Sequence, residues 1–116
     1  MPQRPSIKFS INILNRTVMV GAVHSALQLT NTELKLLVHL INAKGNVVSR
    51  KNLLTGAWGM HPESALQLAT ASRRVDVTVG RIRSKISKAS ERAAKAIMSV
   101  SSEGYKLHCH GVRWVK

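Results

Sequence analysis

The segment from Ser72 to Lys88 contains six Lys and Arg residues but only one acidic residue, Asp76. If this segment is a helix, one narrow stripe of it is apolar and β-branched: Val75, Val79, Ile82 and Ile86. The same spacing on the opposite side gives the residues that we expect to point outward: Arg74, Thr78, Arg81 and Lys85. Solvated helix faces usually mix charges of both signs, so this face indicates contact with a polyanion, in particular a nucleic acid.

The composition of the whole chain supports the same partner. The 116 residues include 18 Lys and Arg against five Asp and Glu, which gives a formal net charge of +13. Such an excess is most easily explained by a polyanionic ligand. No segment approaches 18 uninterrupted apolar residues, so we predict no membrane contact. The single cysteine, Cys109, excludes an intrachain disulfide and fits a cytoplasmic protein.

Short β-like segments precede the helical part of the chain. We expect a flexible lead-in over residues 1–6 and a small antiparallel sheet over residues 7–29. Alternating apolar residues predict the first strand, with one buried face: Ile7, Phe9, Ile11 and Ile13. Further strands are expected at residues 17–20 and 26–29.

A three-helix core is predicted over residues 30–88. Thr30 and Glu33 have the spacing of a capping box, and the helix that they open should bury Leu34, Leu37, Val38 and Ile41. A second helix follows at about residues 50–57. An irregular connection, Gly59–Ala71, with room for a helical turn or two, then leads to a third helix capped by Ser72, with Asp76 near its positive end. We expect Trp58, Leu37, Val79 and Ile82 to share one core.

A β-hairpin at residues 97–109 and a basic tail at residues 110–116 complete the predicted elements. Three stretches, in this order, resemble the effector domain of OmpR/PhoB-type response regulators: LTNTELKLLVHLINAKGNVVSRKNLLTGAWG, RRVDVTVGRIRSKI and SVSSEGYKL. The resemblance extends from about Ile7 to Leu107. It implies an α+β fold, a winged helix-turn-helix that is preceded by a small antiparallel sheet and whose wing is the C-terminal hairpin.

The resemblance also implies a function and a set of contacts. The function is sequence-specific binding of double-stranded DNA by a transcriptional regulator, with the Ser72–Lys88 helix in the major groove. Two copies are expected on repeated half-sites, and the Gly59–Ala71 loop is the expected contact for RNA polymerase. The residues expected to read bases are Arg74, Val77 and Arg81. The residues expected to contact the DNA backbone are Trp58, Arg73, Thr78, Arg83, Lys85, Ser99 and Tyr105. The expected wing contacts are Ser101, Ser102 and Gly104.

The sequence departs from the family pattern in three places. Gly80 stands where relatives commonly have a basic residue, and either permits close backbone approach or is simply tolerated. The wing carries an acidic residue, Glu103, which would repel phosphate, and basic residues of the tail, Arg113 and Lys116, would have to compensate. No receiver domain precedes the sheet, so we expect either a stand-alone regulator or an excised domain.

Other chemistry is poorly supported by the sequence. On a strand, His108 and His110 would point to one face and Cys109 to the other, and no second Cys/His cluster completes a metal site. The five acidic residues are scattered and form no catalytic pair, so we predict neither an enzyme nor a cofactor. The alternative function is a nonspecific basic protein that binds nucleoid DNA or RNA. The RNA version is weakened by the small number of aromatic residues available for stacking on bases.

Overall fold

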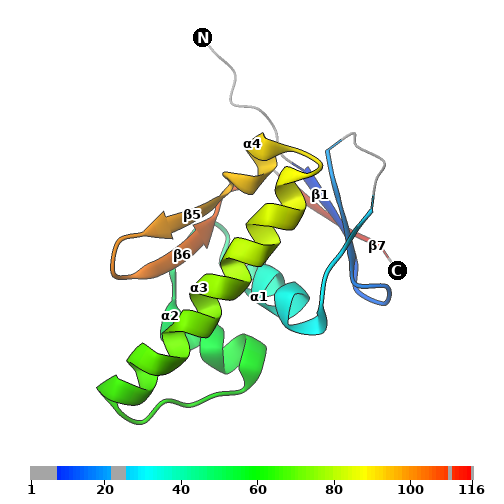
Figure 1. Ribbon diagram of the computed structural model, residues 1–116. Coiled ribbons are helices and arrows are strands. Elements are labelled where there is room, and N and C mark those ends of the chain that lie inside the picture. The colour runs from blue at the N-terminus through cyan, green and yellow to red at the C-terminus, as the bar shows by residue number, and fades with distance from the viewer. Residues whose placement is uncertain (1–7, 22–25, 110, 116) are drawn as a thin grey trace.

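The computed structural model describes residues 8–21, 26–109 and 111–115. The expected lead-in, residues 1–6, lies outside the described residues, as does Ile7. The chain forms two small sheets that flank a set of helices, of which α3 is the longest (Figure 1). The helices are α1 Asn31–Asn42, α2 Arg50–Leu53, the π-helical turn η1 Leu54–Trp58, α3 Ala65–Ser87 and α4 Glu91–Ala94. The strands are β1 Lys8–Asn12, β2 Thr17–Val20, β3 Leu27–Gln28, β4 Val48–Ser49, β5 Ile97–Val100, β6 Gly104–Leu107 and β7 Gly111–Val115.

The N-terminal strands form the predicted sheet with one buried face. The strand order is β3-β2-β1-β7, and β1, β2 and β3 are antiparallel. Phe9 and Ile11 of β1 are fully buried. Ile13 was expected to continue this row, but β1 ends at Asn12 and the Ile13 side chain is 54 % exposed in the turn that follows.

The fourth strand of this sheet corrects the prediction of a basic tail. Residues 111–115 form β7, which runs parallel to β1 and pairs Phe9 with Val112 and Ile11 with Trp114. The first and last described strands therefore lie side by side (Figure 1). The sequence GVRWV does not alternate clearly between apolar and polar residues, so its strand character was not evident.

Helix α1 begins as predicted. The Glu33 amide donates to Thr30 Oγ1 at 3.2 Å, and Glu33 Oε1 accepts from the Thr30 amide at 2.8 Å, which completes the capping box. The buried side of α1 consists of Leu34, Leu36, Leu37 and Leu40, whereas Val38 and Ile41 are only half-buried. The capping prediction is confirmed, and the predicted stripe was rotated by about one residue.

Helix α3 begins earlier than predicted. Ser64, and not Ser72, is its N-cap, with Oγ accepting from the Gln67 amide at 3.1 Å. The helical turns that the sequence allowed within Gly59–Ala71 are continuous with residues 72–87 in one helix, and the Ser72 hydroxyl donates within that helix to the Leu68 carbonyl. Asp76 thus lies in the middle of a 23-residue helix. Its predicted interaction with the helix dipole was wrong, because that effect is confined to the first turn.

The predicted hairpin is formed by β5 and β6, and β4 joins it at the opposite edge of β6. Gly104 has a φ of +148°, and a Cβ at this position would overlap the carbonyl oxygen of Val48. Only glycine therefore allows β4 to approach the hairpin so closely. The hairpin is consequently fixed to the start of α2.

Helices and both sheets share a single hydrophobic core. Leu37, Val79 and Ile82 are fully buried in it, and Trp58 packs against its edge while partly exposed. These positions agree with the common core that the sequence predicted.

Over the described ranges, no helix has both the length and the apolar character needed to span a bilayer.

Candidate nucleic-acid interface

One side of α3 is exposed along most of its length. We call it the outward face, and it consists of Arg73, Arg74, Val77, Gly80, Arg81, Ser84 and Lys88, all of them exposed. Val77, an apolar residue, is 52 % exposed near the middle of the face. Among the described residues, no hydrogen-bond or ion-pair partner engages the side chains of the four cations on this face. Four cations and one apolar group are therefore available to a ligand.

Two residues that were expected to point outward do not. Thr78 is only 7 % exposed, and Lys85 is half-buried and bonded to another helix. Ala71 and Thr78 widen the buried side of α3 along one edge of the apolar stripe. The outward face is therefore centred on Val77, about a fifth of a turn away from the direction that the sequence suggested.

A shallow hollow brings several of the expected contact residues together. Its volume is about 360 Å³. The hollow is lined by Trp58, Arg73, Arg74, Val77, Thr78 and Arg81. All three expected base-reading residues thus meet beside Trp58 of η1, although the three come from a helix and Trp58 from a separate turn. Thr78 contributes a buried wall and not an outward contact.

Tyr105 was expected to contact the DNA backbone, but its hydroxyl is used inside the protein. It donates to Asp76 Oδ1 at 2.5 Å, and the same oxygen accepts from Arg50 Nε at 2.9 Å. The Arg50 guanidinium also lies 5.1 Å from the centre of the Tyr105 ring. Partial burial would raise the pKa of Asp76, but the hydrogen bonds from Tyr105 and Arg50 hold it below its ordinary value. The carboxylate therefore ties α2, α3 and the wing together.

Arg83 is also committed to the wing. Its Nε and Nη2 donate to the Ile97 carbonyl at 3.1 and 2.7 Å, and Nη2 donates to Ser99 Oγ at 3.1 Å. The guanidinium lies 5.6 Å from the centre of the Tyr105 ring. Arg83 and Ser99 are thus brought together as expected, but in contact with each other. We assign both to positioning the wing against α3.

The wing tip differs from the expected set of contacts in one residue. Ser101 and Ser102 are exposed, whereas Gly104 is buried against β4. Glu103 is exposed beside the two serines. Arg113, which was expected to compensate for Glu103, lies on β7 in the N-terminal sheet and not on the wing, and Lys116 lies outside the described residues.

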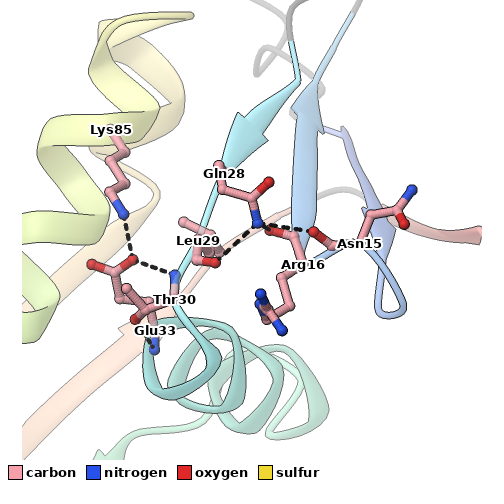
Figure 2. A network of polar contacts seen from close by, with 7 residues as sticks. All are labelled: Asn15, Arg16, Gln28, Leu29, Thr30, Glu33 and Lys85. Atoms are coloured by element: carbon pink, nitrogen blue, oxygen red, sulfur yellow. Dashed lines mark hydrogen bonds and ion pairs between the residues drawn. The ribbon is translucent and has the colours of Figure 1, made fainter.

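Lys85 forms an ion pair at the junction between α3, α1 and the N-terminal sheet (Figure 2). Its Nζ donates to Glu33 Oε1 at 2.6 Å, at the oxygen that also accepts from the Thr30 amide. Beside it, the Gln28 amide group donates to the carbonyls of Asn15, Arg16 and Leu29, which ties the β1–β2 turn to β3. Burial of Glu33 would raise its pKa, but the hydrogen bonds from Lys85 and Thr30 lower it overall.

This ion pair predicts a pH-dependent stability. A carboxyl whose pKa is lowered by folding stabilises the protein above its unfolded value, 4.5 for Glu33, and that stabilisation is lost as pH falls through the folded pKa. Glu33→Gln keeps an acceptor for the Thr30 amide but removes the charge. We expect it to lower the free energy of unfolding by about 1–2 kcal/mol at pH 7, measured by urea denaturation.

The same comparison near pH 3 should show little difference between Glu33→Gln and the unmodified protein, because the carboxyl is then protonated. Lys85→Met is the matched control, since it removes the partner and should raise the pKa of Glu33. An equal destabilisation by Glu33→Gln at both pH values would contradict the role of the ion pair.

In the part of the chain that the structure describes, no three His, Cys, Asp or Glu side chains are grouped to hold a metal ion. His110 lies outside the described residues. Burial raises the pKa of the Cys109 thiol.

A sequence comparison connects this arrangement to a known family. The model of the family described as "Transcriptional regulatory protein, C terminal" matches residues 24–107. The chain belongs to this family. The OmpR/PhoB-type resemblance is thereby confirmed, and the family is one of DNA-binding transcriptional regulators and not a class of enzymes. No curated protein matches the chain with significant sequence similarity.

Solved structures show the same fold. The DNA-binding domain of CpxR from E. coli is 20 % identical, with a TM-score of 0.68, and the match covers 97 % of this chain and 98 % of that one. The DNA-binding domain of E. coli CadC is also 20 % identical, with a TM-score of 0.69 and coverages of 93 % and 95 %. The DNA-binding domain of Klebsiella pneumoniae RstA, solved in complex with the RstA box, is 26 % identical, with a TM-score of 0.62 and coverages of 81 % and 84 %. The winged helix-turn-helix assignment is therefore confirmed.

Proposed function

We propose that this transcriptional regulatory domain binds a specific double-stranded DNA sequence and inserts α3 into the major groove. The observation that supports this proposal best is the outward face, where four cations without a partner among the described residues surround an exposed valine beside the Trp58 hollow. An arginine can donate two hydrogen bonds to guanine, and a valine methyl can pack on the methyl of thymine.

The positions of the side chains support different roles for them in DNA binding. Arg74, Val77 and Arg81 would read bases, and Trp58, Arg73 and Lys88 would contact the backbone. Ser101 and Ser102 would approach the backbone from the wing. The remaining expected contacts would act indirectly, because each already has a partner or is buried: Thr78, Arg83, Lys85, Ser99 and Tyr105.

Two partners follow from the same proposal. We propose that two copies bind repeated half-sites in the cytoplasm.

A depression of about 480 Å³ beside the start of α3 is lined by Met60, Pro62, Leu66 and Arg74, among others, and Leu66 is 77 % exposed. An apolar depression rimmed by an arginine suits contact with RNA polymerase, in the region for which the family resemblance implied such a contact.

The net charge of +13 supports one competing function, nonspecific binding to any nucleic acid. Protection mapping on genomic fragments, with an excess of random-sequence duplex as competitor, distinguishes the two. Specific binding gives discrete protected segments that persist in the presence of the competitor. Uniform protection that the competitor abolishes would support the nonspecific binder.

Binding of duplex DNA should depend steeply on salt concentration. Each neutralised phosphate contributes about −0.9 to the slope of log K against log[salt]. The charges of Arg74 and Arg81 would lie among the phosphates even while their N–H groups bond to bases. If these two, Arg73 and Lys88 each neutralise the equivalent of one phosphate, we expect a slope of roughly −3 to −4. The measurement is a titration of a fluorescent duplex at several salt concentrations. A slope shallower than about −2 would show that the outward face is not the electrostatic contact.

A further inference from the structure

Gly80 lies on the outward face near the middle of α3, and nothing within the described protein requires a glycine there. Its backbone conformation is not among the positive-φ ones, so any residue could adopt it. A Cβ at this position would meet no heavy atom of the described protein within 4 Å. The situation contrasts with Gly104, where both the backbone conformation and the packing against Val48 exclude a side chain.

The interactions within the chain therefore favour alanine at position 80. Glycine is a poor residue in a helix interior because its backbone loses more conformational entropy on folding than that of alanine. Exposure of the site means that an added methyl group would not disturb the core. Nothing among the described residues offsets this cost, so any benefit of glycine at this position would come from contact with another molecule.

The neighbours of Gly80 indicate where that contact lies. Val77 and Arg81 lie to one side of it around the helix axis, on the outward face, whereas Asp76 and Arg83, which hold the wing, lie to the other side. Gly80 thus lies between the residues that would read bases and the residues that position the hairpin. A strand of DNA that passes between α3 and the wing would approach the helix at this point.

We propose that Gly80 is the position at which one sugar–phosphate strand of bound duplex DNA comes closest to α3, and that the absence of a side chain permits this approach. The inference rests on the proposed function. A methyl group would keep the strand roughly 1.5 Å farther from the helix, by the length of the added C–C bond. Hydrogen bonds of about 3 Å do not tolerate that displacement, so contacts from neighbouring side chains would be lost as well.

The test uses Gly80→Ala and a duplex that the unmodified protein protects. We expect the melting temperature to rise by about 2–5 °C and the affinity for the duplex to fall about tenfold. Asn42→Ala is the matched control, because Asn42 is exposed near the end of α1, and alanine there also favours the helix. It should leave the affinity within about twofold of the unmodified protein.

A second variant separates close approach from charge. Gly80→Lys adds a cation at an exposed site, which would strengthen binding if the position merely faced the phosphates across solvent. We expect weaker binding instead, because the side chain fills the space that the strand needs. Unchanged or tighter binding by either Gly80 variant would overturn the inference. If the unmodified protein failed to bind any duplex, the proposed function itself would fall, which is a separate outcome.

Discussion

Replacement of Ile82 by alanine is expected to lower the free energy of unfolding by about 2–5 kcal/mol. Ile82 is fully buried in the core. Removal of its outer carbons loses the free energy gained by burying them and leaves a cavity that the surrounding helices fill only partly. The measurement is urea denaturation monitored by circular dichroism. The loss should appear as a lower midpoint with an unchanged dependence on denaturant.

Val77→Ala is the matched control for this experiment, since Val77 is on the same helix but exposed. Alanine is a better helix former than valine, so this variant should change the unfolding free energy by less than about 0.5 kcal/mol. A loss of under about 0.5 kcal/mol for Ile82→Ala would instead mean that the helix is rotated relative to the core, with another face buried.

Arg81→Ala should remove most of the discrimination at one base position. The Arg81 side chain is exposed on the outward face and has no partner within the described part of the protein. If it donates to guanine in the major groove, its loss should reduce the preference for the correct base by ~1–3 kcal/mol. Affinity for a scrambled duplex should fall much less. The measurement is a paired titration of the protected duplex and the scrambled one.

Arg73→Ala provides the comparison, because Arg73 lies on the same face and is expected to contact phosphate. It should weaken binding to both duplexes about equally and reduce the salt slope by roughly one unit. Arg83 is unsuitable for this purpose, since its guanidinium already bonds to Ile97 and Ser99 and its loss would disturb the wing. If Arg81→Ala and Arg73→Ala lose affinity alike on both duplexes, nonspecific binding becomes the better account.

Local signals in the sequence predicted most of the elements correctly. The capping box at Thr30 and Glu33 depends on residues three positions apart, and periodicity identified the buried residues Val75, Val79, Ile82 and Ile86. The start of α3 was missed because Ser72 is also a good capping residue. Ser64 caps the helix instead, and the stretch between them, SALQLATA, contains no residue that interrupts a helix.

The partners of the polar side chains could not be predicted in the same way. Asp76 bonds to Arg50, 26 positions away, and to Tyr105, 29 positions away. Lys85 reaches Glu33 across 52 positions. Such pairs depend on how the helices and the wing pack against one another, and that packing cannot be predicted from a local sequence pattern. A cationic residue expected to contact DNA therefore looked the same in the sequence whether it lacks a partner among the described residues, like Arg81, or is already bonded, like Arg83.

The parallel pairing of β7 with β1 has a consequence for how the protein is made. Lys8 and Gly111 are partners about 100 positions apart, so the ribosome must synthesise all the residues between them before β1 acquires its second neighbour. Closure of so long a loop is entropically unfavourable and slows folding. During that interval the edge of the strand that carries Phe9 and Ile11 presents unpaired N–H and C=O groups, to which another nascent chain can add. A chain truncated before Gly111 would therefore leave this edge of β1 unpaired and be prone to aggregation, even though it contained every residue of the outward face.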